Sequence, residues 1–519
     1  MTGTAPGWVQ LELAPAPDGL PRLLRLPGVR RLARPAPAAT DWHDAPDGRL
    51  EAAGLILARR PDGWTLERLH PAPALPWPPA TPAPVLAAAD DPAALGPGVP
   101  ADPVPVAAFR GRLRRLRFTP PDADPQAAPQ AAPGAISGAA FEADGRTGDP
   151  APDGDGPAVE LDLLHGGVRG AGSARPACRI VLRGRPEAVA RACAALAEAV
   201  PLGVPRASLA AEALAAARGT EPPPRRLGAP EVPADAALSD LVAHVLGHLT
   251  DVLLHWSRLA GTARTPEPVH QMRVALRRLR SAVSVFRGAA GCPALDRLKP
   301  GLREVMQRAG TARDWDVFLD GPGAELAALL PGDRRAATLL AAARRRREAA
   351  YADLRAELAS PGFRDLALGL AQAAALRPWE WDAGSGRQGR ADAYAARVLD
   401  RRWKRAAARA EGLAGLPDEA LHELRKEGKR LRYAAECFAP LFPGKATRRF
   451  FKRLAALQEA LGGLNDAAVA TGLVAALGPA GRGFAGGAVV GLVAARAADA
   501  KSEARRTWKR LRRAGPFWR

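Results

Sequence analysis

The chain has 519 residues, of which 47% are hydrophobic, so it is long enough for roughly two to four domains with sizeable cores. Its net charge of +20 is concentrated in the second part. Residues 1–230 carry 25 Lys+Arg against 24 Asp+Glu, whereas residues 231–519 carry 49 against 30. We therefore expect residues 231–519 to bind a polyanionic partner.

Three sequence features argue against a secreted, metal-binding or membrane protein. The four cysteines are scattered without paired spacing, which excludes a disulfide or metal-binding signature. The N-terminus lacks the charged and apolar regions of a signal peptide. The apolar stretch 484–495 is too short to span a bilayer and is interrupted by glycine. We therefore expect a cytoplasmic protein.

The first part of the chain is predicted to form short strands, followed by two helices. Asp62-Gly63 is a hairpin signal, and the alternation in the strand at 106–118 puts Arg110, Arg112 and Arg114 on one face. The other predicted strands are WVQLEL, LEAAGLILAR, GWTLERL, AVELDLLHGGVRG and ACRIVLRG. Two Pro-rich stretches, 71–105 and 119–157, are expected to be loops, and the helices are expected at 186–200 and 207–219.

After a Pro-rich linker around 221–235, the pattern is helical to the end. We expect the helices to divide into two antiparallel bundles. Their predicted ranges are 236–260, 267–288, 294–310, 314–330, 333–359, 362–376, 390–412, 418–439, 446–462, 465–477, 484–499 and 500–514.

One of these helices carries a cationic stripe. In VHQMRVALRRLRSAV (269–283), His270, Arg273, Arg277 and Arg280 fall within a sector of roughly 80°, beside an apolar stripe. Like charges at this spacing repel each other by a few tenths of a kcal/mol per pair. A single such helix is compatible with a solvated basic face, but an anionic ligand along the stripe would also explain it.

The same pattern occurs a second time, at an offset of 152 residues. In LHELRKEGKRLRYAAECF (421–438), His422, Arg425, Lys429, Arg430 and Arg432 match His270, Arg273, Arg277, Arg278 and Arg280. Asp314 and Asp466 are related by the same offset, but Asp316 is matched by Ala468. Repetition at this long period favours two similar lobes that bring two cationic stripes together. We expect the two aspartates to orient arginines or to cap helices.

The helical part, from about residue 235 to 519, resembles a CHAD domain. The resemblance depends on the two basic helices, RDWDV, LNDAAV and the terminal RRTWKRLRRAGPFW. It implies an all-α fold of two pseudo-symmetric four-helix bundles, with basic helices that bind inorganic polyphosphate, and location at polyphosphate granules. Arginine and lysine can follow a phosphate polymer without base readout.

The first part resembles a CYTH domain, the triphosphate tunnel β-barrel, but most functional residues differ. Active members open with Glu-x-Glu-x-Lys, whereas this chain has Gln10, Glu12 and Ala14. Hydrolysis of this class needs several carboxylates to hold a divalent metal, so the single Glu12 is a poor magnesium site. We therefore expect a degenerate barrel that acts as a scaffold.

These observations give an α+β protein: an antiparallel β-barrel (1–222, with loops at 71–105 and 119–157), a linker (223–234) and the CHAD helical domain (235–519). We expect polyphosphate binding without catalytic residues, metal or cofactor. A residual triphosphatase in the barrel and nucleic-acid binding by the helices remain alternatives, although few aromatics accompany the basic stripes. The predicted polyphosphate-binding residues are His270, Arg273, Arg277, Arg278, Arg280, His422, Arg425, Lys426, Lys429, Arg430 and Arg432.

Overall fold

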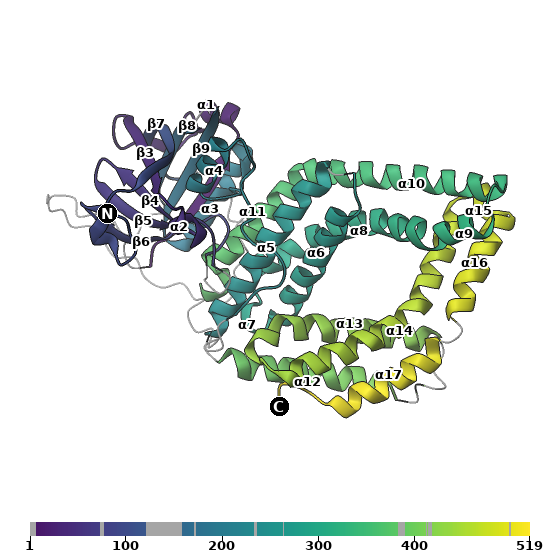
Figure 1. Cartoon of the computed structure of the whole chain (residues 1–519). Coiled ribbons are helices and arrows are strands. Elements are labelled where there is room, and N and C mark those ends of the chain that lie inside the picture. Colours follow the sequence, from purple (N-terminus) through teal and green to yellow (C-terminus); the bar gives the residue numbers. More distant parts are fainter. Residues whose placement is uncertain are drawn as a thin grey trace, which may run out of the picture. The chain divides into compact units, whose positions relative to one another are not determined.

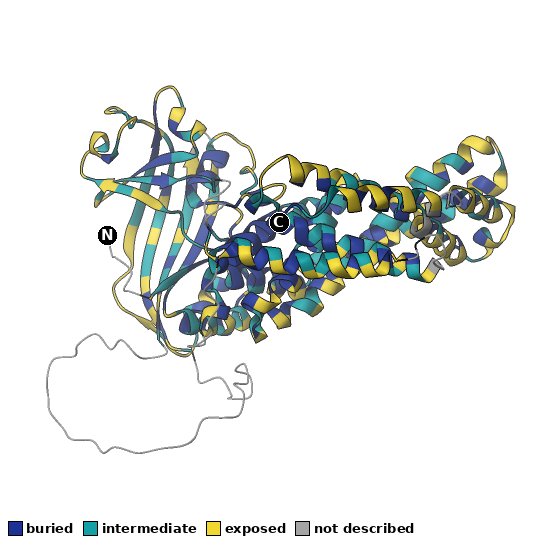
Figure 2. Cartoon of the chain, turned by 90° about the horizontal axis from the view of Figure 1, so that it is seen from below, coloured by how far each residue is buried: buried dark blue, intermediate teal, exposed yellow. Residues whose placement is uncertain are grey.

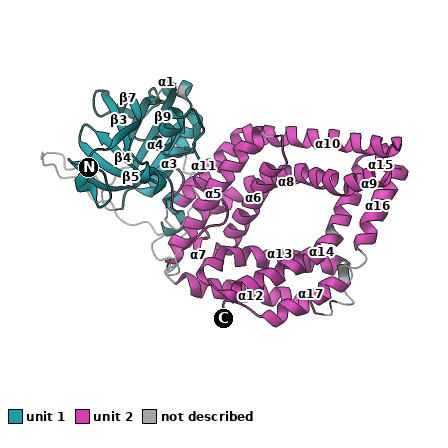
Figure 3. Cartoon of the chain, viewed as in Figure 1, with its two compact units in different colours: residues 1–70, 80–223, 375–381 teal, residues 71–79, 224–374, 382–519 magenta. Residues whose placement is uncertain are grey.

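The computed structural model describes residues 7–72, 77–120, 158–170, 173–232, 236–262, 264–381, 390–411, 413, 418–497 and 500–519. The chain divides into two compact units (Figure 3). Unit 1 comprises residues 1–70, 80–223 and 375–381, and unit 2 comprises residues 71–79, 224–374 and 382–519. Most of the predicted loop 119–157 lies outside the described residues.

Unit 1 is built on one antiparallel sheet in the order β10-β1-β9-β8-β7-β3-β4-β5-β6, with β2 paired to β7 (Figure 1). Its strands are β1 (Val9–Pro15), β2 (Val29–Arg31), β3 (Ala36–Asp44), β4 (Leu55–Arg60), β5 (Gly63–Arg68), β6 (Val85–Ala89), β7 (Val104–Phe118), β8 (Val159–Gly170), β9 (Ser173–Gly184) and β10 (Leu202–Gly203).

The sheet is not closed into a barrel, so that part of the predicted fold is wrong. The strand order is an open path that ends at β6, which pairs only with β5 among the described strands. The segment before β6 does reach β1, because the Glu12 N–H donates to the carbonyl of Ala80 at 2.7 Å. It cannot extend this contact into a ladder, since Pro82 and Pro84 have no N–H to donate.

Short helices cover the sheet: α1 (Leu20–Leu23), α2 (Arg49–Ala52), α3 (Pro186–Ala199) and α4 (Leu209–Ala217). The alanine-rich α4 packs into a core with Trp42 and Phe109. Ser208 caps α4 by accepting the Ala211 N–H at 3.2 Å, and its hydroxyl donates to the carbonyl of Leu69. The core and the cap together fix α4 against the sheet.

Apart from an isolated bridge between Ala237 and Arg390, the regular secondary structure of unit 2 is helical among its described residues. Buried and exposed positions alternate along its helices in stripes, as expected for amphipathic helices (Figure 2). Its helices are α5 (Leu238–Thr262), α6 (Glu267–Val285), α7 (Arg287–Ala290), α8 (Pro293–Phe318), α9 (Ala324–Leu329), α10 (Arg334–Ala359), α11 (Pro361–Leu376), α12 (Ala391–Arg409), α13 (Asp418–Phe438), α14 (Lys445–Ala476), α15 (Pro479–Arg482), α16 (Phe484–Ala497) and α17 (Ala500–Ala514). None of the described helices is both long and apolar enough to cross a membrane.

The helices of unit 2 pack in two similar series (Figure 1). In the first series α5 packs on α6, α6 on α8 and α8 on α10. In the second, α12 packs on α13, α13 on α14 and α14 on α17. The basic helices α6 and α13 also contact each other. At this junction Phe286 and Phe438, which are related by the 152-residue offset, meet edge to face at 5.5 Å between ring centroids.

Candidate anion-binding surface

The basic helices α6 and α13 bury one face and leave their cations half-buried or exposed. In α6 the buried residues recur every three or four positions, at Val269, Met272, Leu276, Leu279 and Val283. Because this apolar stripe is locked into the core, the neighbouring stripe of arginines is held at the edge of the packed surface.

Four cations from the two helices form what we call the central cluster: Arg273 and Arg277 from α6, and Arg425 and Lys429 from α13. Arg273 is equivalent to Arg425 and Arg277 to Lys429 in the repeat. Burial lowers the pKa of Lys429 to about 8, and the charges of Arg425, Arg277 and Arg273 add to this lowering. The structure therefore brings the two stripes near each other at these four positions.

Cations of the central cluster are poorly neutralised. Among the described residues, Arg273, Arg277 and Lys429 form no hydrogen bond or ion pair. The Nε of Arg277 is buried without a hydrogen-bond partner in the described part, and its guanidinium lies 5.7 Å from the ring centroid of Tyr433. Buried donors are normally satisfied, so this arrangement favours an anionic ligand that supplies acceptors.

Two aspartates at equivalent positions of the repeat lie beside the central cluster. Burial raises the pKa of Asp314, the charge of Arg273 opposes this, and the charge of Asp466 raises it further. Asp314 is inside α8 and Asp466 inside α14, so neither caps a helix. Both carboxylates act on cluster cations at a distance, since neither forms an ion pair within 4.0 Å among the described residues.

The two histidines of the repeat differ in environment. His270 is half-buried, and its pKa is lowered by burial and then by the charge of Arg313, with Arg277 and Arg273 contributing. The lowered pKa favours the neutral imidazole, which can donate through only one nitrogen. His422 is exposed at the start of α13.

Four further predicted residues, which we call the rim cations, are held by acidic or amide partners. Glu436 binds Arg278 at 3.3 Å and Arg432 at 2.7 Å, and Arg432 also donates to the Gln458 side chain at 2.9 Å. Lys426 pairs with Glu423 at 2.8 Å, and Arg430 pairs with Glu427. The last predicted residue, Arg280, is exposed. The rim cations are Arg278, Lys426, Arg430 and Arg432.

Sequence reasoning missed two residues that belong with the central cluster. The charge of Arg313 lowers the pKa of both His270 and Arg273, and the ring of Tyr433 lies against the guanidinium of Arg277. Arg313 precedes Asp314, which the repeat had singled out, so its position was a usable signal. Tyr433 has Ser281 at the equivalent position, and a comparison of the two copies does not reveal it.

In unit 1, several of the charged groups that a metal or phosphate could use are already paired. The guanidinium of Arg179 is buried and lies 3.1 Å from Glu12, and it also pairs with Glu212. Arg60 binds Glu67 at 2.6 Å, and Arg110 binds Asp41 at 2.5 Å. Within the described ranges, no three His, Cys, Asp or Glu side chains are grouped so that they could hold a metal ion. The residues present do not fit a metal-dependent hydrolase site.

Unit 2 is thus a helical domain that has two related halves and a basic helix in each. Residues 236–475 match the model of the CHAD domain family, so this part of the chain is a CHAD domain. Over 230 residues the chain is 32% identical to an uncharacterized protein found in two strains of Mycobacterium tuberculosis. The match covers 43% of this chain and 43% of the relative, so it spans less than half of that protein's length.

Two solved structures are also similar to part of the chain. The crystal structure of the CHAD domain from the plant Ricinus communis is 29% identical, with a TM-score of 0.49, and the match covers 56% of this chain and 96% of that one. PptA from Streptomyces chartreusis is 18% identical, with a TM-score of 0.39, and the match covers 54% of this chain and 99% of that one.

Proposed function

We propose that the CHAD domain binds inorganic polyphosphate at the central cluster. The observation that carries this proposal is the convergence of four cations from equivalent positions of two helices, three of which form no ion pair within 4.0 Å among the described residues. Cations held this close repel each other, and an anionic ligand relieves the repulsion. The rim cations, His270, His422 and Arg280 extend the surface beside it.

Polyphosphate suits this surface better than nucleic acid does. A phosphate polymer carries charge along its whole length and has no bases to accommodate. Few aromatic rings accompany the cluster; Tyr433 lies under Arg277, where it contributes a cation–π contact. CHAD domains are associated with polyphosphate granules, and we extend that location to this chain.

The N-terminal unit is proposed to be a non-catalytic, CYTH-like domain. Its Glu12 is neutralised by Arg179, which leaves it a poor metal ligand. We retain the boundaries 1–222, 223–234 and 235–519 for this domain, the linker and the CHAD domain. The two series of helix contacts in unit 2 support the expected pair of four-helix bundles.

A salt titration of polyphosphate binding tests the proposal. Removing two phosphate contacts with Arg273→Ala/Arg425→Ala should weaken binding by at least about tenfold, because a hydrogen bond to a charged group contributes about 1.5–3 kcal/mol. The plot of log affinity against log salt should become shallower by about 0.7 per lost contact.

The matched control is Lys426→Ala/Arg430→Ala, which removes two rim cations that pair with glutamates of their own helix. Both double variants lose two positive charges, but this one should lower the affinity for polyphosphate much less. Equal losses in the two double variants would reduce the proposal to non-specific attraction. Competition adds a second criterion: a nucleic-acid probe that polyphosphate fails to displace would favour nucleic acid as the ligand.

A further inference from the structure

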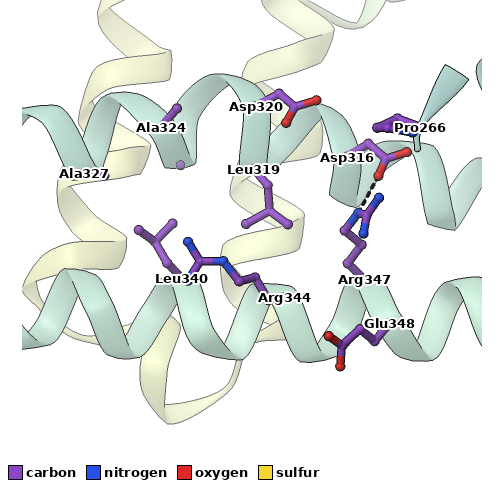
Figure 4. Close-up of a pocket in the computed structure, with 11 residues that line it drawn as sticks. Pro266, Asp316, Leu319, Asp320, Ala324, Ala327, Leu340, Arg344, Arg347 and Glu348 are labelled. Carbon is purple, nitrogen blue, oxygen red and sulfur yellow. Dashed lines mark hydrogen bonds and ion pairs between the residues drawn. The ribbon is translucent and has the colours of Figure 1, made fainter. Parts of the chain in front are cut away.

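Two charged features of the CHAD domain lie outside the duplicated pattern and meet at one pocket. Asp316 is matched by Ala468 in the second half, and the run Arg344–Arg347 lies on α10. The pocket lies between α8–α9 and α10 and has a volume of about 420 Å³ (Figure 4). That volume is within the range that small-molecule sites occupy.

Asp316 builds the polar end of the pocket. Its side chain is fully buried; one oxygen accepts from the Nε of Arg347 at 2.6 Å and the other accepts from the Tyr351 hydroxyl at 2.8 Å. The guanidinium of Arg347 also lies 4.5 Å from the ring centroid of Tyr351. These contacts fix the guanidinium so that its remaining N–H groups are pre-organised donors.

Apolar side chains line the pocket beside Arg344. Leu319 and Leu340 face each other across it, with Ala324 and Ala327 alongside. The chain forms a π-helical turn at Leu319–Gly323, a feature often found at functional sites. A Cβ on Gly323 would lie 3.0 Å from Cδ2 of Leu340, so a glycine preserves this spacing. The equivalent stretch of the second half lies in the uninterrupted helix α14.

Two arginines of the pocket lining point into the space between the helices, and two of the acidic side chains point away from it. The guanidinium groups of Arg344 and Arg347 lie between the two helices, whereas the carboxylates of Asp320 and Glu348 are turned away from that space (Figure 4). Arg344 makes no hydrogen bond or ion pair within the described part of the chain. An anionic head group is therefore favoured at the arginines and a compact apolar group at the leucines.

We propose that this pocket binds a small organic phosphate monoester. Its dianionic head accepts hydrogen bonds from Arg344 and Arg347, and its apolar body packs between Leu319 and Leu340. Arg344 forms no ion pair within the described part, and Arg347, although its Nε is paired with Asp316, keeps N–H groups that can donate to phosphate oxygens. The residues that line the pocket are not members of the central cluster, although Arg313, which acts on that cluster, lies 4.0 Å from Asp316. The proposal does not depend on polyphosphate binding.

Calorimetric titration of the full chain with phenyl phosphate tests the site, with phenylacetate and inorganic phosphate as comparison ligands. Phenyl phosphate should bind about tenfold more tightly than either, because phenylacetate has a monoanionic head and inorganic phosphate has no apolar body. Equal binding of phenyl phosphate and phenylacetate, or no binding of phenyl phosphate, would overturn the assignment.

Variants on one helix locate the binding. Arg344→Gln should abolish phenyl phosphate binding, whereas Arg345→Gln changes an exposed neighbour that does not line the pocket and should leave it intact. The Arg273→Ala/Arg425→Ala protein should retain phenyl phosphate binding, which separates this site from the central cluster. Equal behaviour of the Arg344 and Arg345 variants would refute the pocket.

Discussion

At the residue scale, Lys429 distinguishes the two halves of the central cluster. Its equivalent in the first half is an arginine, Arg277. Lys429 faces Arg425 on its own helix, Arg277 and Arg273 on α6, Asp466 on α14 and Asp314 on α8. Since its pKa is about 8, part of its charge is lost just above neutral pH.

Polyphosphate affinity should therefore fall as pH rises above about 8, by at most tenfold per pH unit for one proton. A bound polyanion raises the pKa of Lys429, so binding takes up a proton in this range. The free energy of unfolding of the unliganded protein has the opposite pH dependence. The pKa of Lys429 is lower in the folded than in the unfolded state, so this residue makes the free energy of unfolding rise with pH above about 8.

The measurement is affinity at pH 7, 8 and 9, together with calorimetry in buffers of different ionisation enthalpy to count protons. Lys429→Arg makes the two halves alike at this position and should flatten the affinity profile. A variant whose affinity falls with pH as steeply as that of the unsubstituted protein would place the proton uptake elsewhere.

At the element scale, Gly310 of α8 leaves room for the guanidinium of Arg273 from α6. A Cβ on Gly310 of α8 would lie 2.8 Å from Nη1 of Arg273. Real Cβ atoms do not approach so closely, so the guanidinium of Arg273 has to move aside. The equivalent glycine of α14, Gly462, would meet only Asp466 Oδ2, at 3.9 Å, among the described atoms.

Gly310→Ala should therefore weaken polyphosphate binding several-fold without destabilising the fold. Alanine favours a helix interior by about 1 kcal/mol over glycine, so the urea unfolding midpoint should stay the same or rise. Gly462→Ala is the matched control and should raise stability without a loss of affinity. A drop in unfolding midpoint for Gly310→Ala would mean that the helices, rather than Arg273, yield to the new methyl group.

The same elements show where sequence patterns succeed and fail. Periodicity located α6 and α13 closely because their apolar stripes are regular. It split α8 and α14 into two helices each, at Gly310 and Gly462–Gly463, where packing in the bundle overrides the low helix propensity of glycine. It missed β3 and β6, whose alanine-rich and Pro-flanked stretches carry little strand propensity, although neighbouring strands supply hydrogen bonds to both.

At the scale of the whole molecule, the 152-residue repeat predicted that two basic helices would converge, and the contact of Phe286 with Phe438 places equivalent residues together. The repeat did not predict which cations remain unpaired. That depends on carboxylates such as Glu436, which neutralises Arg278 from the other half, and one sequence does not show which residues meet across the halves. Sequence patterns likewise could not predict whether the N-terminal sheet closes. Closure requires the two edge strands to form hydrogen bonds with each other.

The central cluster takes cations from both halves, so both halves are expected to contribute to polyphosphate binding. Because Arg273 and Arg425 occupy equivalent positions and each is influenced by its own aspartate, Arg273→Ala and Arg425→Ala should weaken polyphosphate binding to a similar extent, about tenfold each. Direct titration of both single variants and the double variant gives the coupling between them. If one half supplied the binding alone, one single variant would match the double variant and the other would bind like the unsubstituted chain. Comparable single losses and a larger double loss are expected instead, because one polyanion neutralises cations contributed by both halves.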